Sequence, residues 1–205
     1  MKAITIQQFG IPPLLTITTQ HEPVTMNDEA LVGVRAIAIG QIDKQILQGR
    51  TTILTPLIGG INIAGVISAI ETYFADTEEC AWTEGDRVIV NPIKFVNGIP
   101  QLFGLHTPGG YAEYIDVPFE NLYKLPATIS FTAAAVAVAK WTDTHLSTKL
   151  APTDLENLFH RFPQDMETLL TQYETEESMT ILTPEDFLGH THDSEIANMM
   201  VLKWR

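Results

Sequence analysis

The chain has 205 residues, a formal net charge of −13 and 45% hydrophobic residues. This length and composition predict a folded protein of one or two domains with a sizeable core. The negative charge argues against a nucleic-acid partner, because binding to a phosphate backbone requires clustered Lys and Arg. One cysteine, Cys80, excludes an intramolecular disulfide and a cysteine cluster for structural zinc.

The first residues predict a strand and carry no export signal. No apolar run reaches the ~18 residues that a membrane helix needs. We therefore expect a cytoplasmic protein in a reducing environment, with no membrane partner.

Residues 1–126 contain short apolar runs separated by Gly and Pro, which is typical of a β barrel or sandwich. The expected strands are 2–6, 14–18, 30–37, 61–71, 87–91, 111–117 and 122–125. A short helix interrupts them, since Ile42, Ile46 and Leu47 keep helical spacing and Gly49 stands where a C-terminal cap would.

The remainder predicts helices. An alanine-rich run over 131–150 favours a helix of about five turns that connects the barrel to the rest. Residues 151–205 hold eleven acidic and three basic residues, which predicts a separate acidic tail. We expect a helix there that begins at Thr153 and that Pro163 ends or kinks, a second over 166–173, and a third that begins at Thr183 and Pro184.

The predicted fold class is mainly β with flanking helices (α+β). Its three parts are a barrel over 1–126, a connecting helix over 127–150 and a small acidic helical tail over 151–205.

Six segments of the chain carry a family resemblance through their sequences and their order: MKAITIQQFG, VRAIAIGQIDKQILQG, GGINIAGVI, EGDRVIV, TPGGYAEYIDVP and FTAAAVAVAKWT. Together they resemble the N-terminal GroES-like domain of medium-chain dehydrogenases/reductases, the superfamily of alcohol dehydrogenases and quinone oxidoreductases. The resemblance implies a GroES-like barrel and an oxidoreductase. The closing ANMMVLKWR faintly resembles the strand by which the family's chain returns to this domain.

The family's catalytic-zinc ligands would fall at Gly40, Ile61 and Val138, none of which can bind zinc. The resemblance is therefore closer to the zinc-free quinone oxidoreductases and enoyl reductases, in which NADPH or NADH carries the hydride. The nucleotide-binding domain that follows the alanine-rich helix in the family has no counterpart, because residues 151–205 contain one glycine, Gly189. We expect no zinc, and we do not expect this chain alone to bind NADP.

Four residues are candidates for a site. Asp43 and Thr142 stand where the resemblance implies a cleft carboxylate and a hydroxyl offered to the nicotinamide, and Gln41 could bind a substrate carbonyl. His106 could act as an acid or base near pH 7. Each also has a structural interpretation: a carboxylate favoured at a helix N-terminus for Asp43, and a surface residue for the other three.

A further group, His190, His192 and Asp193, could hold a metal ion, but such a turn is more typical of a helix entry.

Two functional hypotheses result. The first is an NAD(P)H-dependent quinone or enone oxidoreductase that is inactive alone and depends on a partner chain for the nucleotide fold. The second is a non-catalytic interaction module whose open cleft is covered by its own tail or by another subunit, including a homo-oligomer.

Overall fold

The computed structural model describes residues 1–50, 53–72, 80–146, 152–172, 180–189 and 200–204. The strands are β1 (Lys2–Gln8), β2 (Leu14–Thr19), β3 (Glu29–Ile39), β4 (Leu57–Ile58), β5 (Asn62–Glu71), β6 (Arg87–Val90), β7 (Ile93–Val96), β8 (Ile99–Leu102), β9 (Tyr114–Pro118), β10 (Leu122–Lys124), β11 (Thr180–Leu182) and β12 (Met200–Leu202). The helices are α1 (Gln41–Leu47), α2 (Phe131–His145), α3 (Pro152–Gln172) and α4 (Pro184–Gly189), with a 3-10 turn at Phe119–Asn121.

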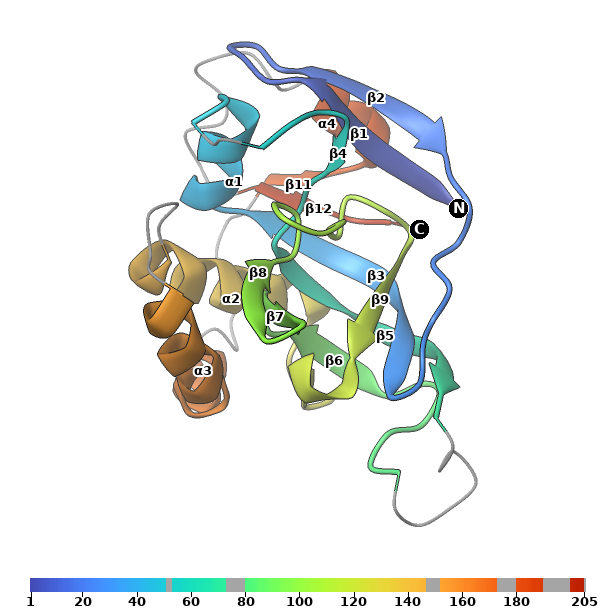
Figure 1. Ribbon diagram of the computed structural model, residues 1–205, viewed down its shortest axis with the longest axis vertical. Coiled ribbons are helices and arrows are strands. Elements are labelled where there is room, and N and C mark those ends of the chain that lie inside the picture. Colours follow the sequence, from blue (N-terminus) through green and yellow to red (C-terminus); the bar gives the residue numbers. More distant parts are fainter. Residues whose placement is uncertain (51–52, 73–79, 147–151, 173–179, 190–199, 205) are drawn as a thin grey trace.

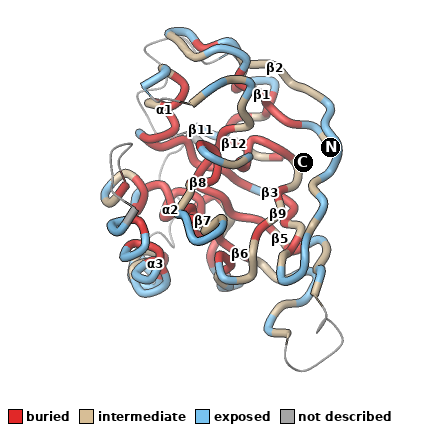
Figure 2. Tube along the Cα trace, in the orientation of Figure 1, coloured by how far each residue is buried: buried red, intermediate tan, exposed pale blue. Residues whose placement is uncertain are grey.

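Strand β3 is the centre of the main sheet, whose path is β10-β6-β5-β3-β12-β11. One edge of β3 pairs with β5 along its length. The other edge is shared, because β9 pairs with Glu29–Gly33 and β12 pairs with Ile37–Ile39. A second sheet, β2-β1-β4, lies beside it (Figure 1). These two sheets form the expected barrel, and Figure 2 shows β3 buried along most of its length, whereas β2 is intermediate or exposed.

The segment 107–113 joins the two sheets as a tight crossing. Gly110 and Tyr111 donate their N–H groups to the carbonyls of Gly60 and Gly59 at 2.8 and 2.9 Å. A Cβ on Gly109 would lie 2.4 Å from the Gly60 carbonyl oxygen, so only glycine fits there. The strand expected over 111–117 begins later, at Tyr114. Before it, the Tyr111 carbonyl accepts the Ile4 N–H of β1, and the Glu113 carbonyl accepts the Val34 N–H of β3.

Strands β7 and β8 form a hairpin that we did not predict. Its turn is Asn97-Gly98, and both residues have positive φ, as a two-residue hairpin turn requires.

Helix α1 agrees closely with its prediction, and Gly49 has the positive φ expected after its C-terminus. Helix α2 begins after Ser130, whose hydroxyl accepts the Ala133 N–H at 3.1 Å. The helix ends at His145 and not at residue 150, because Leu146 has an extended backbone. Helix α2 packs against β3 and β5, and α3 packs on α2 as an outer layer (Figure 1).

Helix α3 runs through Pro163 as one helix, so an end of the helix at that proline and a separate second helix over 166–173 are both wrong. Its apolar stripe continues on both sides of the proline, with Phe162 and Met166 buried. The Phe162 ring meets Trp141 of α2 edge-on at 4.9 Å and Tyr123 of β10 at 5.3 Å. Packing of this stripe therefore outweighs the hydrogen bond that proline removes.

The tail also contains two strands that the helical prediction lacked. Strand β12 extends the main sheet by pairing with β3, and β11 pairs in parallel with β12. The closing segment thus returns to the barrel as the resemblance implied. The third helix start is confirmed: Thr183 and Asp186 cap each other, with the Asp186 N–H donating to the Thr183 hydroxyl at 3.1 Å. Among the described helices, none is both long and apolar enough to span a bilayer.

Candidate functional site

The amino end of α1 is held by a buried carboxylate. Asp43 is 2% exposed and accepts N–H groups from Gly40 at 3.1 Å and from Ile61 at 3.2 Å. The Asn62 side-chain amide donates to it at 2.9 Å. One side chain therefore satisfies the first turn of α1 and the start of β5.

Asn62 extends this network to α2. Its side-chain oxygen accepts the Thr142 hydroxyl at 2.8 Å, and its amide also donates to the Ala38 carbonyl at 2.9 Å. Thr142 and Asn62 are both completely buried. We call Asp43, Asn62 and Thr142 the buried polar triad; it ties α1, β5 and α2 together.

Burial dominates the electrostatics of the triad. Burial, with a smaller contribution from nearby Asp143, raises the pKa of Asp43 to about 7, although the N–H groups of Gly40 and Ile61 oppose the shift. Burial also lowers the pKa of Lys44, against the attraction of Asp143 and Asp43. The Tyr111 hydroxyl is buried and has no hydrogen-bond partner among the described residues, and burial raises its pKa well above the usual value.

The positions of the family's zinc ligands do not fit a metal. Ile61 and Val138 are buried apolar side chains, and Gly40 has no side chain. The space beside Gly40 is filled by Asp143, which lies 2.7 Å from where a Cβ would stand and accepts the Gln41 N–H. No group of three or more His, Cys, Asp or Glu within the described ranges could hold a metal ion.

Of the four candidates, Asp43 and Thr142 come together through Asn62, whereas Gln41 and His106 do not join them. Gln41 is exposed, and its backbone, not its side chain, bonds to Asp143. His106 accepts the Leu102 N–H through Nδ1 at 3.0 Å within its own turn, and burial lowers its pKa. Thr142 has no exposed surface, so its hydroxyl is not offered to a nicotinamide in this structure.

Two residues of this region escaped the sequence analysis as candidates. Asp143 follows Thr142 in a helix, and no sequence pattern links it to Gly40, which lies about 100 positions earlier. Tyr111 was interpreted only as part of a strand. The group His190, His192 and Asp193 lies outside the described residues.

Comparison with known proteins agrees with this architecture. The family described as the alcohol dehydrogenase GroES-like domain matches residues 26–127. A quinone oxidoreductase from Sus scrofa is 26% identical over 147 residues, which are 69% of this chain and 39% of that protein. An alcohol dehydrogenase structure from Escherichia coli CFT073, complexed with NADH, is 26% identical with a TM-score of 0.57, over 69% of this chain and 43% of that one.

A thermostable alcohol dehydrogenase from Pyrobaculum aerophilum, solved with cobalt and zinc, shares the fold over 100% of this chain and 99% of that one, with 14% identity and a TM-score of 0.70.

The barrel and its site thus define a GroES-like domain. Through this domain, the chain belongs to the medium-chain dehydrogenase/reductase superfamily. It spans between 28% and 40% of the length of the curated relatives that it matches.

Proposed function

We propose that this chain is the substrate-side domain of a zinc-independent, NAD(P)H-dependent quinone or enone oxidoreductase, and that it is inactive without a nucleotide-binding fold supplied from elsewhere. One observation carries the proposal. Asp143 fills the space of a ligand side chain at Gly40 and bonds to α1, in a chain whose relatives include quinone oxidoreductases. Such a site favours a reaction in which the nicotinamide cofactor transfers the hydride and the protein positions the substrate and the cofactor.

The chain's own residues would contribute position and not proton transfer. Asp43 is enclosed by three donors and has no surface from which to reach a substrate. Its role is to hold the amino end of α1, and with it the exposed Gln41 side chain, at a fixed place on the barrel. Gln41 remains the candidate for a substrate carbonyl.

A cofactor titration tests the dependence on a second fold. NADPH fluorescence is followed as the purified chain is added, with a complete quinone oxidoreductase as the positive control. We expect no saturable binding at about millimolar cofactor, because a dinucleotide needs its own glycine-rich helix N-terminus. Saturable binding would show that the chain is an independent enzyme.

A chimera tests the assignment itself. The nucleotide-binding domain of the Sus scrofa quinone oxidoreductase replaces residues 147–151, between α2 and α3. We expect NADPH consumption with 1,4-benzoquinone, and a lower rate in the Gln41→Ala chimera. A chimera that binds NADPH but leaves the quinone unreduced would contradict the proposal.

A second candidate function is a non-catalytic interaction module, and the packing of the tail favours it. Residues after 151 bury Phe162, Val201 and Trp204 against the barrel and α2. A chain that covers its own apolar surface in this way does not need a second domain for that purpose. Light scattering together with limited proteolysis distinguishes the cases: this candidate requires a tail that is resistant to protease, or a stable oligomer.

A further inference from the structure

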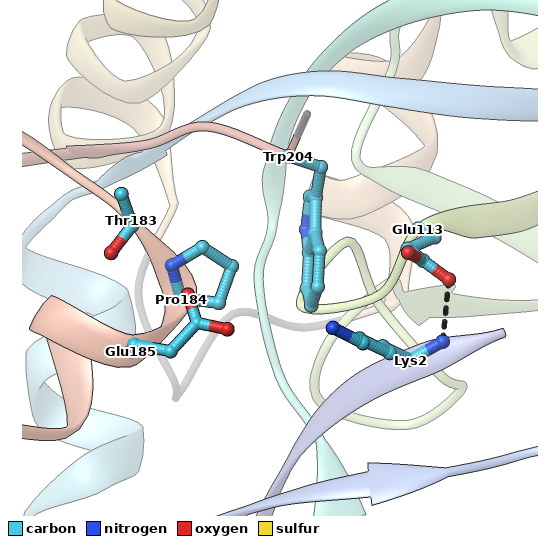
Figure 3. A pocket seen from close by; sticks show the side chains of 6 residues that line it. All are labelled: Lys2, Glu113, Thr183, Pro184, Glu185 and Trp204. Carbon is cyan, nitrogen blue, oxygen red and sulfur yellow. Dashed lines mark hydrogen bonds between the residues drawn. The ribbon is translucent and has the colours of Figure 1, made fainter.

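Some carboxylates of this chain hold the backbone of an element that is distant in the sequence. Glu113 accepts the Lys2 N–H of β1 at 2.6 Å, beside a hollow of about 200 Å³ (Figure 3). That contact joins two parts of the barrel. Asp143 makes the same kind of contact with α1, because it accepts the Gln41 N–H at 2.7 Å, but it reaches α1 from α2.

The Asp143 carboxylate takes the place of a side chain that Gly40 does not have. A Cβ on Gly40 would lie 2.7 Å from Oδ1 and 3.2 Å from Oδ2 of Asp143. Gly40 itself offers no side-chain hydrogen bond to α1. The backbone N–H groups of Gln41 and Ile42 bond to Asp143 instead. Two successive residues of α1 are therefore tied to one side chain of α2.

The charges around Asp143 match this position. Burial raises the pKa of its carboxyl, whereas its two N–H donors and two nearby ammonium groups oppose the rise. These ammonium groups belong to Lys44 of α1 and Lys140 of α2, so one cation from each helix favours the ionised carboxylate. The electrostatics thus support the same contact as the hydrogen bonds.

Gln41 is held through its backbone while its side chain is exposed. Asp43 fixes the start of α1 to the barrel, because it accepts the Ile61 N–H and the Asn62 amide. Asp143 fixes the Gln41 backbone to α2. The place of the Gln41 side chain therefore depends on two carboxylates, one that faces the barrel and one that comes from α2.

The end of α2 is also where a nucleotide-binding fold would join the chain, since the junction proposed above lies at 147–151. The distance between Gln41 and a bound cofactor would then depend on how α1 is fixed to α2. An error of about 1 Å in such a distance can cost ~10²-fold in rate. The contact between Asp143 and Gln41 is therefore in a position to affect the reaction.

We propose that Asp143 is a positioning residue: it fixes the Gln41 backbone from the last turn of α2 and so sets where the Gln41 side chain meets a substrate carbonyl. This role rests on the function proposed above, because that function gives Gln41 its substrate. Thr142, the preceding residue of α2, is completely buried and cannot take the same part.

Amide hydrogen exchange of the full chain, followed by ¹⁵N NMR, tests the contact without any activity. In Asp143→Ala the Gln41 N–H should exchange about tenfold faster or more, because a charge-assisted hydrogen bond is lost. Asp143→Asn keeps an acceptor oxygen and should give an intermediate rate. Glu156→Ala, which removes an exposed acid on α3, should leave the rate unchanged. The Leu146 N–H, which bonds to the Thr142 carbonyl at 2.8 Å, reports whether α2 is still folded.

A double-mutant cycle in the quinone-reducing chimera tests whether Asp143 acts through Gln41. Asp143→Ala should lower kcat for 1,4-benzoquinone by about tenfold and leave the KM for NADPH unchanged. In the Gln41→Ala background the same change should lower kcat by less than about twofold, because the residue that Asp143 positions is already gone. Asp143→Asn should restore part of kcat.

The outcomes separate this role from the function on which it rests. Unchanged exchange at Gln41 in both folded Asp143 variants would overturn the role of Asp143. Equal losses of kcat in the two backgrounds would also overturn it, because Asp143 would then act independently of Gln41, while the proposed oxidoreductase function would stand. A chimera that binds NADPH but leaves the quinone unreduced would overturn that function and, with it, any part of Asp143 in catalysis.

Discussion

The carboxylate of Asp143 stands in the space that a side chain on Gly40 would need. An ideal Cβ at position 40 would lie 2.7 Å from Oδ1 of Asp143, and the same oxygen accepts the Gln41 N–H at 2.7 Å. Gly40 directly precedes α1, whereas Asp143 lies in the last turn of α2, so the two residues come from different elements.

Adding a side chain at Gly40 should therefore destabilise the protein. Gly40→Cys should lower the free energy of unfolding by about 1–3 kcal/mol, because the side chain must displace Asp143 from a packed site. Urea denaturation measures the change. Gly189→Ala is the matched control, since nothing lies within 4 Å of a Cβ there, and it should change stability by less than about 0.5 kcal/mol. The double variant Gly40→Cys/Asp143→Ala should recover part of the loss; a fully stable single variant would refute the steric argument.

Stability should depend on pH through Asp43. Its pKa is raised from 3.8 to about 7 in the folded protein, so the folded state binds a proton more tightly than the unfolded state. The resulting stabilisation is fully present below about pH 4 and is lost as the pH rises to about 7. The loss amounts to roughly 4 kcal/mol.

Other acidic groups also titrate in this range, so the comparison is with Asp43→Asn. The difference in unfolding free energy between the two proteins should change between pH 4 and 7 and be constant above pH 8. A difference that does not vary with pH would mean that Asp43 keeps an ordinary pKa. Glu156→Gln, at an exposed position on α3, serves as the control.

Thr142 should matter for stability. Thr142→Val keeps the shape but leaves the side-chain oxygen of the buried Asn62 without the hydroxyl donor. We expect a loss of about 1–3 kcal/mol in unfolding free energy. Thr144→Val removes an exposed hydroxyl on the same helix, which bonds to the Lys140 carbonyl, and should change stability by less than about 0.5 kcal/mol. Equal effects of the two variants would indicate that the triad contributes no stability.

The outer helix should be essential to the fold. Phe162→Ala removes a fully buried ring that contacts Trp141 and Tyr123, and should cost about 3–5 kcal/mol. Among the described residues, the neighbouring Arg161 forms one surface ion pair, with Asp165, so Arg161→Ala should cost less than about 1 kcal/mol. Thermal unfolding followed by circular dichroism measures both. If Phe162→Ala lost no more stability than Arg161→Ala, the packing of α3 on α2 would not contribute to the core.

Local patterns in the sequence predicted most elements well. The helix start at Thr183 and the cap at Gly49 depend on neighbouring residues, so they were visible in the sequence. Asn97-Gly98 is an equally local hairpin signal, although the β7–β8 hairpin was not among the expected elements. The helix end expected at Pro163 does not occur, because the cost of a proline is local whereas the packing that offsets it, with Trp141 and Tyr123, is not.

The site was less predictable, because it depends on contacts between distant positions. Asp43 was recognised as a carboxylate in the first turn of a helix, but its bonds to Ile61 and Asn62 require the folded barrel. The three-residue strands β11 and β12 carry too short a pattern to reveal which strand they join.

The pairing of β12 with the end of β3 has a consequence for the order of folding. During synthesis, Ile37, Ala38 and Ile39 emerge early, but their partners in β12 emerge only after residues 40–199 have been made. Until then the backbone of this part of β3 lacks that partner, and a sheet edge without a partner can pair with the wrong strand. The barrel's last stretch of sheet therefore closes after translation of nearly all the described chain, and slow, late pairing of this kind is where misassembly of the nascent protein would begin.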